Sequence, residues 1–445
     1  MPLDTSVLEL LQKPKSFFYC ELARMKFATK TIISCLLVMV VCATAYLNAA
    51  LYFKPEIKTV EQDTINYDLL LQLRYLKGAI ASGEAEAMQK LYPEGYIFMH
   101  ALTALAWHDF SRQCSPSSAL YKEAHTEISK SCSAITSDLA KSTFDPYLQL
   151  PYGAFYTGWS NFLLGKKLGL ESMNKRNIAE VNLFKQQCES IAHALDSSAS
   201  PYLESYYKAA WPADMLMCIT SLRLHDQLYT PHYTATVEMW LKKVKKNLDV
   251  NGLIPHASDA VTGKPNEDAR GSSQSLMLIF LYEIDPDFAR QQFERYKKYF
   301  LESCLGLPGI REYCNGTAGS GDIDSGPVIF GMGAAATLVG MRTMATYNDQ
   351  SNANALQCGI EAFGIATKND YEKKYIFGTL PIADAFIAWS HAGLPRKMHA
   401  ANDVSWRNRL HMYSTLFATI AMLLVIIVWN YKKSFKKSNE RSNLS

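Results

Sequence analysis

The sequence has no strong excess of charge and lacks the motifs that identify many enzyme classes. Its 445 residues carry a formal net charge of only +3, whereas a nucleic-acid-binding domain is normally strongly basic. No Walker, HExxH, GxSxG or dinucleotide-binding pattern occurs in the structural context that it requires. These absences argue against a nucleic-acid partner and against nucleotide-dependent chemistry.

Metal-binding patterns are missing as well. The chain has ten cysteines but no CxxC or other spacing typical of a zinc site. We therefore expect no metal centre. In an oxidising compartment Cys114 could bridge to Cys132, or Cys304 to Cys314, but spacing alone does not determine the pairing.

Charged residues are also absent from two long apolar segments, 31–53 and 411–431. Each is long enough as a helix to cross a hydrocarbon core of roughly 30 Å. Each is therefore predicted to be a transmembrane helix. A cleaved signal peptide is the alternative for the first, because Ala43-Thr44-Ala45 resembles a cleavage site. The 30-residue leader before it and the length of the apolar run favour an uncleaved anchor.

The distribution of basic residues predicts the orientation in the membrane. Residues 1–30 form a basic leader and residues 432–445 a basic tail. By the positive-inside rule both termini are expected in the cytoplasm. A domain of residues 61–395 is then expected on the extracytoplasmic side, in the periplasm or at the cell surface.

Strand-type alternation is nearly absent between the two apolar segments, and the apolar periodicity predicts helices throughout. Twelve helices are expected, at 61–82, 93–113, 118–139, 151–169, 176–197, 211–229, 231–249, 266–285, 286–304, 325–349, 351–364 and 380–393.

Every second helix begins after a regular step of about 55 to 60 residues, and repetition at a fixed period indicates one unit used many times. Several of these starts share an aromatic residue and a proline followed by small or acidic residues, as in Trp211-Pro212-Ala213-Asp214. The pattern predicts an all-α fold of six helical hairpins closed into an (α/α)6 toroid, with alternate helices inside. An open helical solenoid is the alternative.

Asp214 is the leading candidate for acid–base chemistry. It lies at a predicted helix start beside Trp211, where an apolar wall could raise its pKa. An acid in the first turn also interacts favourably with the helix dipole, and this structural role is the alternative. Tyr152, near the start of an earlier alternate helix, is expected with Trp211 on the wall of a substrate site. Core packing accounts for most of the surrounding aromatic residues.

Two long loops, 251–271 and 306–326, lead into alternate helices, and loops of this length are usually functional or disordered. We expect catalytic and substrate-binding residues there. The catalytic candidates are His256, Asp322 and Asp324, and the substrate-binding candidates are Arg270, Gln274, Arg311 and Glu312. The alternatives are a surface role for the histidine and helix capping for Asp324.

The segment 266–338 resembles the linalool dehydratase-isomerase family. The resemblance is carried by ARGSSQSLMLIFLYEIDPDFARQQFERYKKYF and by the later REYCNGTAGSGDIDSGPVIFGMGAAATL, and weaker similarity covers 147–393. It implies an exported (α/α)6 barrel that hydrates, dehydrates or isomerises a monoterpene alcohol by acid–base chemistry without a cofactor. The family's active-site cysteine corresponds to Asp214, so a carboxylate stands here in place of a thiol.

Three functions are compatible with these features. The first is a cofactor-free lyase or isomerase acting on an alcohol-bearing small molecule, such as a terpenoid. The second is a glycan hydrolase or lyase in which two of Asp214, Asp322 and Asp324 flank the scissile bond. The third is a non-catalytic binding protein of the envelope.

Overall fold

The computed structural model describes residues 15–323, 325–395 and 405–442, and the chain divides into two compact units. One unit is a barrel, Phe53–Trp406, and the other combines the two chain ends, Met1–Tyr52 and Arg407–Ser445. Asp324, one of the predicted catalytic residues, lies outside the described residues.

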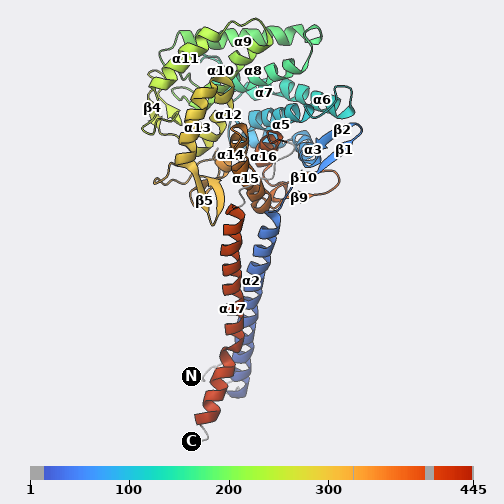
Figure 1. Ribbon diagram of the computed structural model, residues 1–445, viewed down its shortest axis with the longest axis vertical. Helices are drawn as coiled ribbons and strands as arrows, with labels where there is room; N and C mark the ends of the chain where they lie inside the picture. Colours follow the sequence, from blue (N-terminus) through green and yellow to red (C-terminus); the bar gives the residue numbers. More distant parts are fainter. Residues whose placement is uncertain (1–14, 324, 396–404, 443–445) are drawn as a thin grey trace, which may run out of the picture. The chain divides into compact units, whose positions relative to one another are not determined.

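Six parallel helices form the inner ring of the barrel (Figure 1). They are α5 (Gly95–Ser111), α8 (Gly153–Leu170), α10 (Pro212–Leu228), α12 (Gly271–Ile284), α14 (Ala334–Thr346) and α16 (Pro381–Ala392). Each packs on the next in this order, and α16 packs on α5. The ring is therefore closed, so the (α/α)6 prediction is confirmed and the open solenoid is excluded.

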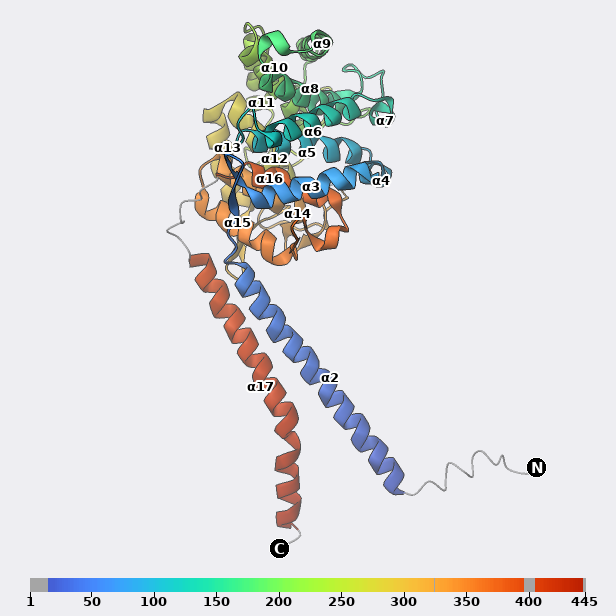
Figure 2. The ribbon, with the colours of Figure 1, turned by 90° about the vertical axis from the view of Figure 1, so that its right-hand side faces the viewer.

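Six further helices alternate with the inner ones and pack outside them (Figures 1 and 2). They are α3 (Tyr67–Ala81), α6 (Ala119–Ile135), α9 (Ile178–Asp196), α11 (Thr234–Lys246), α13 (Pro286–Phe300) and α15 (Gln350–Phe363). Because consecutive helices are antiparallel, all six inner helices begin at the same end of the barrel. We call this end the mouth.

Aromatic side chains of the inner helices fill the interior of the ring. Phe98 of α5 meets Trp159 of α8 edge-on, with ring centroids 5.3 Å apart, and its ring is tilted against that of Phe386 of α16, with centroids 5.4 Å apart. Phe280 of α12 lies 6.0 Å from Trp389 of α16 in a stacked arrangement. These pairs join helices from different parts of the ring, so much of the aromatic richness of the sequence serves the core.

Two glycines bring the mouth segments close to the inner helices. A Cβ atom on Gly153, at φ +78°, would lie 2.2 Å from the carbonyl oxygen of Ser205, and one on Gly271 would lie 1.8 Å from that of Arg311. Only glycine allows such an approach. The segment before α10 therefore rests on the start of α8, and the 306–326 loop rests on the start of α12.

The helix boundaries differ from expectation where short hairpins intervene. The described residues contain five two-stranded antiparallel ladders, whereas the sequence indicated almost no strand. They are β1 (Ile57–Val60) with β2 (Asp63–Asn66), β3 (Ala257–Ser258) with β4 (Pro265–Glu267), β5 (Leu301–Cys304) with β6 (Leu307–Ile310), β7 (Val328–Ile329) with β8 (Met332–Gly333), and β9 (Thr367–Lys368) with β10 (Lys373–Lys374).

These hairpins explain three wrong helix starts. The helices predicted from 61, 266 and 325 begin at Tyr67, Gly271 and Ala334, because β2, β4 and β8 occupy the preceding residues. Strands this short leave too few residues for an alternation pattern to be recognised. The additional short helices α4 (Glu84–Leu91) and α7 (Asp138–Lys141) were also missed.

The two chain ends form long helices, α2 (Lys15–Ala50) and α17 (Ser405–Ser442). Phe27–Ala50 and Ser405–Asn430 are long and apolar enough to be membrane spans, and two such helices fit a two-pass membrane protein. They overlap the predicted spans, although the first ends at Ala50 rather than Phe53. The extracytoplasmic location of the barrel stays a prediction.

Polar side chains connect α2 and α17 at both ends of the pair. The Asn48 amide donates to Ser414 Oγ at 2.9 Å, and Trp429 Nε1 donates to Ser34 Oγ at 2.6 Å. Residues early in one helix therefore face residues late in the other, which makes the pair antiparallel. Hydrogen bonds of this kind hold membrane helices together because their alternative is an unpaired polar group in hydrocarbon.

Candidate functional site

Asp214 lies in the first turn of α10, at the mouth of the barrel. Its carboxylate accepts a hydrogen bond of 2.6 Å from the hydroxyl of Ser205, which belongs to the segment that rests on Gly153. Trp211 precedes α10, half-buried, as the sequence indicated. The close backbone contact at Gly153 thus sets the position of the hydroxyl that holds Asp214.

The next residue along the chain holds a second carboxylate. The hydroxyl of Tyr206 donates to Glu94, which immediately precedes α5, and its ring meets that of Trp211 edge-on, with centroids 5.9 Å apart. Consecutive residues therefore bind Asp214 and Glu94 from one segment at the mouth. Sequence reasoning did not select Glu94 or Ser205, although Glu94 belongs to the proline-containing pattern that several helix starts share.

Tyr152 lies at the start of α8 in a left-handed conformation, φ 65°. Its ring is tilted against that of Tyr156, with centroids 5.5 Å apart, and Phe144 stacks on the ring of Tyr206 at 5.8 Å. Aromatic side chains thus lie at the starts of the inner helices, next to the two carboxylates. The Tyr152 backbone is strained for a residue other than glycine, which is frequent at functional sites.

Arg270 forms the centre of a second group, at the start of α12. Its Nε donates to Glu312 at 2.8 Å, and its terminal nitrogens donate to Asp322 at 2.6 Å and to the hydroxyl of Ser325 at 3.0 Å. Its guanidinium also lies 5.3 Å from the ring centre of Tyr313. Four residues of the 306–326 loop are thereby attached to one buried side chain.

The carboxylates in this group differ in protonation behaviour. Glu312 is fully buried, and burial raises its pKa despite the hydrogen bonds from Ser272 and the charge of Arg270. Burial also acts to raise the pKa of Asp322, but hydrogen bonds from Arg270 and Ser325 outweigh it and lower the value to about 2. Asp322 is therefore ionised at neutral pH, and its side chain is 47% exposed.

His256 has both ring nitrogens engaged. Its Nε2 lies 3.3 Å from a terminal nitrogen of Arg270, and its Nδ1 contacts the hydroxyl of Ser273. Because a guanidinium can only donate, Nε2 must accept and the proton must be on Nδ1. Burial and the neighbouring Arg270 charge lower the histidine pKa to about 4. The free protein therefore holds His256 neutral at physiological pH.

The remaining predicted binding residues have partners elsewhere in the protein. Gln274 is buried and donates to the carbonyl of Ile254 at 2.6 Å. Arg311 pairs with Glu302 in β5 and donates to the carbonyl of Thr317 at 3.2 Å. Gln274 thus binds loop backbone, and Arg311 binds a strand carboxylate as well as loop backbone, so these contacts lie apart from the Arg270 group.

Backbone contact links the two groups. The amide of Ser258, two residues after His256, donates to the carbonyl of Ala210 at 3.0 Å, just ahead of Trp211 and Asp214. Both groups therefore lie at the mouth and are joined through backbone, with Gln274 and Arg311 bonded outside them. A shared pocket around the two groups stays a prediction.

A further carboxylate, Asp384, lies in the first turn of α16 and is 2% exposed. One oxygen accepts from the amide of Tyr375 at 2.9 Å, and the other has no hydrogen-bond partner among the described residues. Burial raises its pKa to about 7. Neighbouring positions of α16, at Phe386 and Trp389, supply the ring interior, so Asp384 belongs to a different face of the helix.

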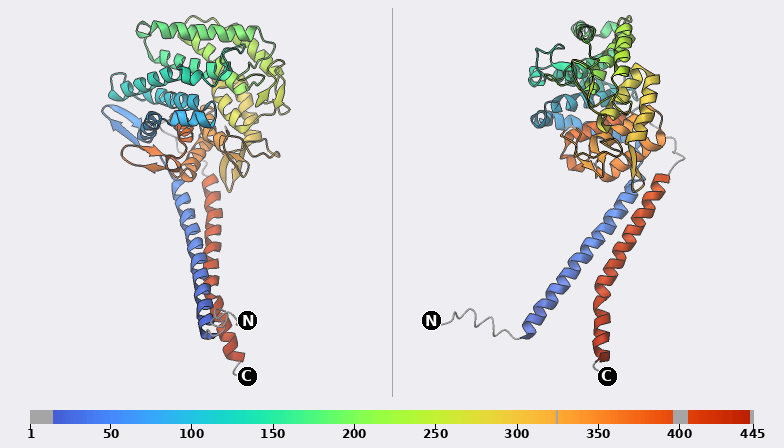
Figure 3. Two further views of the ribbon diagram at one scale, coloured as in Figure 1. Left: turned by 180° about the vertical axis from the view of Figure 1, so that it is seen from behind. Right: turned by 90° about the vertical axis from the view of Figure 1, so that its left-hand side faces the viewer.

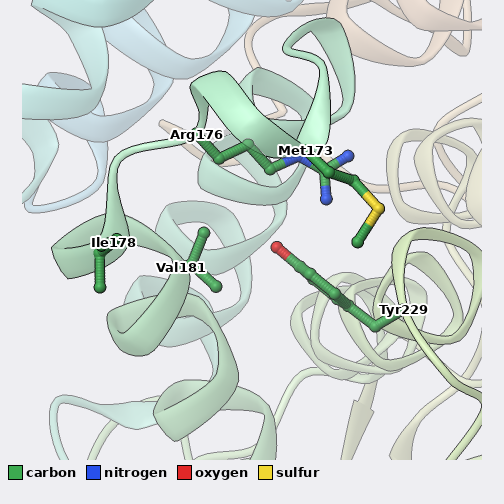
Figure 4. A pocket seen from close by; sticks show the side chains of 5 residues that line it. All are labelled: Met173, Arg176, Ile178, Val181 and Tyr229. Atoms are coloured by element: carbon green, nitrogen blue, oxygen red, sulfur yellow. The ribbon is translucent and has the colours of Figure 1, made fainter.

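One surface cavity of about 220 Å³ lies where the inner helices α8 and α10 end, opposite the mouth, and Figure 4 shows the side chains that line it. It is lined by Met173, Arg176, Ile178, Val181 and Tyr229, from the ends of α8 and α10 and the start of α9. None of the predicted site residues lines it. Within the described residues no group of histidine, cysteine and acidic side chains has the arrangement of a metal site. The thiols that form no disulfide include Cys132, Cys304 and Cys314.

No protein-family model matches the chain, and no curated protein matches it. Among solved structures, it is similar to the crystal structure of an unsaturated glucuronyl hydrolase specific for heparin. The TM-score is 0.41 with 11% sequence identity, over 85% of this chain and 98% of that chain. At that level the likeness does not bear on substrate or chemistry.

Proposed function

We propose that the barrel is a cofactor-free lyase or isomerase that acts on an alcohol-bearing, partly apolar small molecule at the mouth. The observation that carries this proposal is that two consecutive residues each bind a carboxylate. Ser205 binds Asp214, and Tyr206 binds Glu94. The aromatic rings of Trp211 and its neighbours supply an apolar wall next to them, as an apolar substrate requires.

The proposed chemistry needs one proton donor and one proton acceptor. In a dehydration, an acid protonates the hydroxyl that leaves as water, and a base removes a proton from the neighbouring carbon, so that a double bond forms. We assign the acid–base role to Asp214, and we assign Glu94, bound by a phenol hydroxyl, as its partner. Over the cycle the base returns its proton and the acid regains one, so no cofactor is consumed.

The Arg270 group has a supporting role in this proposal. Arg270 and Glu312 hold the 306–326 loop over the start of α12, while the exposed, ionised Asp322 faces solvent there. Among the loop residues, Asp322 and His256 are the ones we propose to contact substrate polar groups. His256 serves as a neutral hydrogen-bonding residue rather than as a cation, because its pKa is about 4.

A glycan hydrolase or lyase is the second candidate. The observation that favours it is the exposure of tyrosine rings in the loops at the mouth: Tyr147 is 93% exposed and Tyr207 is 70% exposed. Such rings can stack against sugar faces, and a pair of carboxylates is what glycoside hydrolysis uses.

The test is turnover by the purified full chain with two substrate panels, monoterpene alcohols and acidic oligosaccharides. Asp214→Asn is expected to reduce the rate by about 10²- to 10⁴-fold, the usual cost of losing a general acid or base. Asp384→Asn is the matched control, since it changes the first-turn acid of another inner helix. Turnover of oligosaccharides alone would select the second candidate.

Two outcomes would contradict an acid–base role for Asp214. A variant that is destabilised but fully active would make the carboxylate a structural acid of the first helical turn, worth about 1 kcal/mol. Binding of a panel compound without turnover in the wild type would make the barrel a binding protein of the envelope.

A further inference from the structure

Several bulky apolar residues have a left-handed backbone conformation and exposed side chains. Leu305 has φ 50° and is 61% exposed, Phe330 has φ 51° and is 83% exposed, and Phe377 has φ 58° and is 64% exposed. Ile365 and Ile376, at φ 46° and 44°, are also exposed. All five lie between β5 and α16, and we call them together the apolar face.

Neither turn geometry nor solvation favours these residues. A left-handed conformation costs a residue with a Cβ atom roughly 1–2 kcal/mol, and the turns of two-residue hairpins strongly prefer asparagine or aspartate before glycine. Here Leu305-Gly306 and Phe330-Gly331 form the turns of β5–β6 and β7–β8. A strained, apolar and exposed side chain at a tip points to a contact outside the folded chain.

The members of the apolar face come from adjoining elements. Strand β6 contacts α15 and β8, so the two hairpins and α15 are neighbours. Ile365, Ile376 and Phe377 lie in the connection from α15 to α16. Within the barrel, α15 and the β5 hairpin are on one side, and α9 and α11 on the other (Figures 1 and 2). The further views show the same separation between the region of α15 (orange) and that of α9 (green) (Figure 3).

The chain enters the barrel at the same side. The carbonyl oxygen of Phe53 accepts a hydrogen bond from the thiol of Cys358 in α15 at 3.9 Å. The ammonium nitrogen of Lys373, in β10, lies 4.3 Å from the centre of the Phe53 ring. The candidate span ends at Ala50. Phe53 follows that end by three residues, which reach at most about 10 Å.

We propose that the apolar face rests on the surface of the lipid bilayer, with its tips inserted between the lipid head groups. The proposal rests on the membrane anchoring proposed for α2 and α17. The short connection at Phe53 favours the bilayer over a second copy of the chain, because it keeps this side near the membrane whether or not another copy is present. In that position the apolar side chains at the tips are removed from water, which is energetically favourable.

The full chain in lipid nanodiscs tests this proposal. Phe330→Trp and Phe377→Trp each add one indole to the seven native tryptophans, and the emission of the added residue is the difference from wild type. Ile178→Trp is the control, because Ile178 is 77% exposed and begins α9 on the opposite side. With brominated lipids we expect strong loss of the added emission at 330 and 377, and none at 178.

Equal quenching at the three positions, or none at 330 and 377, overturns the proposal. A second copy is the occupant instead if Phe330→Ser lowers the oligomeric mass of the detergent-solubilised chain. Alkaline carbonate extraction of wild-type membranes tests the anchoring separately. If the chain is released, anchoring fails, and the same variants are measured on vesicles of the same brominated lipid, where quenching at 330 and 377 but not at 178 still supports the face.

Discussion

Asp384 makes the stability of the barrel depend on pH in a direction opposite to most carboxylates. Its pKa is raised by burial from the ordinary 3.8 to about 7, so the fold favours the neutral acid. A group with a raised pKa contributes fully to stability below its unfolded pKa, and the contribution is lost as the pH rises through the folded pKa. The loss therefore falls between about pH 4 and pH 7.

The size of the effect follows from the shift. A gap of about three pKa units corresponds to about 4 kcal/mol between the two protonation states. For a barrel of about 350 residues, with an unfolding entropy near 2.1 cal/mol/K per residue, this equals roughly 5 °C in Tm. Asparagine cannot ionise, and its side-chain oxygen can still accept from the amide of Tyr375.

The stability of Asp384→Asn relative to wild type should therefore increase as the pH is raised. We expect the difference in Tm, variant minus wild type, to increase by roughly 5 °C between pH 4 and pH 8. Thermal unfolding of the full chain, followed by circular dichroism, measures it. Taking the difference removes the contribution of His256 and of other groups that both proteins share. A difference that stays constant with pH, or decreases, would refute the reasoning.

Two further variants test how the 306–326 loop is held. Arg270→Gln leaves Glu312 without its cation in a fully buried position. We therefore expect a loss of about 3–5 kcal/mol in the free energy of unfolding. An unchanged Tm together with unchanged proteolysis of the loop would show that Arg270 does not hold the loop. Gly271→Ala would place a Cβ 1.8 Å from the oxygen of Arg311 and should severely destabilise the barrel, whereas Gly359→Ala, with no atom within 4 Å, should be neutral or gain up to about 1 kcal/mol. Equal Tm values for the two alanine variants would show that the close approach is not required.

The periodic parts of the fold were predictable because their signals are long. Apolar periodicity over a dozen or more residues identified the twelve principal helices, and the repeat of their starts predicted which six lie inside. The start at Pro212 was placed within a residue, because proline marks a first turn. The starts at Gly271 and Ala334 were misplaced by several residues, since strands of two or three residues carry no periodic signal of their own.

The candidate site was predictable only in part. Helix starts in a closed ring converge, so Asp214, Arg270 and Glu312 could be assigned to the mouth from spacing. Their partners could not. Ser205 and Glu94 are ordinary residues in sequence. They become notable only where Gly153 brings one segment against another and the phenol of Tyr206, in the segment before α10, reaches Glu94 at the start of α5.

The sequence by itself thus determined the architecture, because local apolar patterns dictate which faces of each helix are buried and the repeat length dictates how the hairpins close. The tertiary structure decided the chemistry of individual groups. Burial raises the pKa of Asp384 and, together with the charge of Arg270, lowers the pKa of His256, while hydrogen bonds from Arg270 and Ser325 keep Asp322 ionised despite its partial burial. These properties depend on distances between residues far apart in the chain, and such distances are set only when the ring closes.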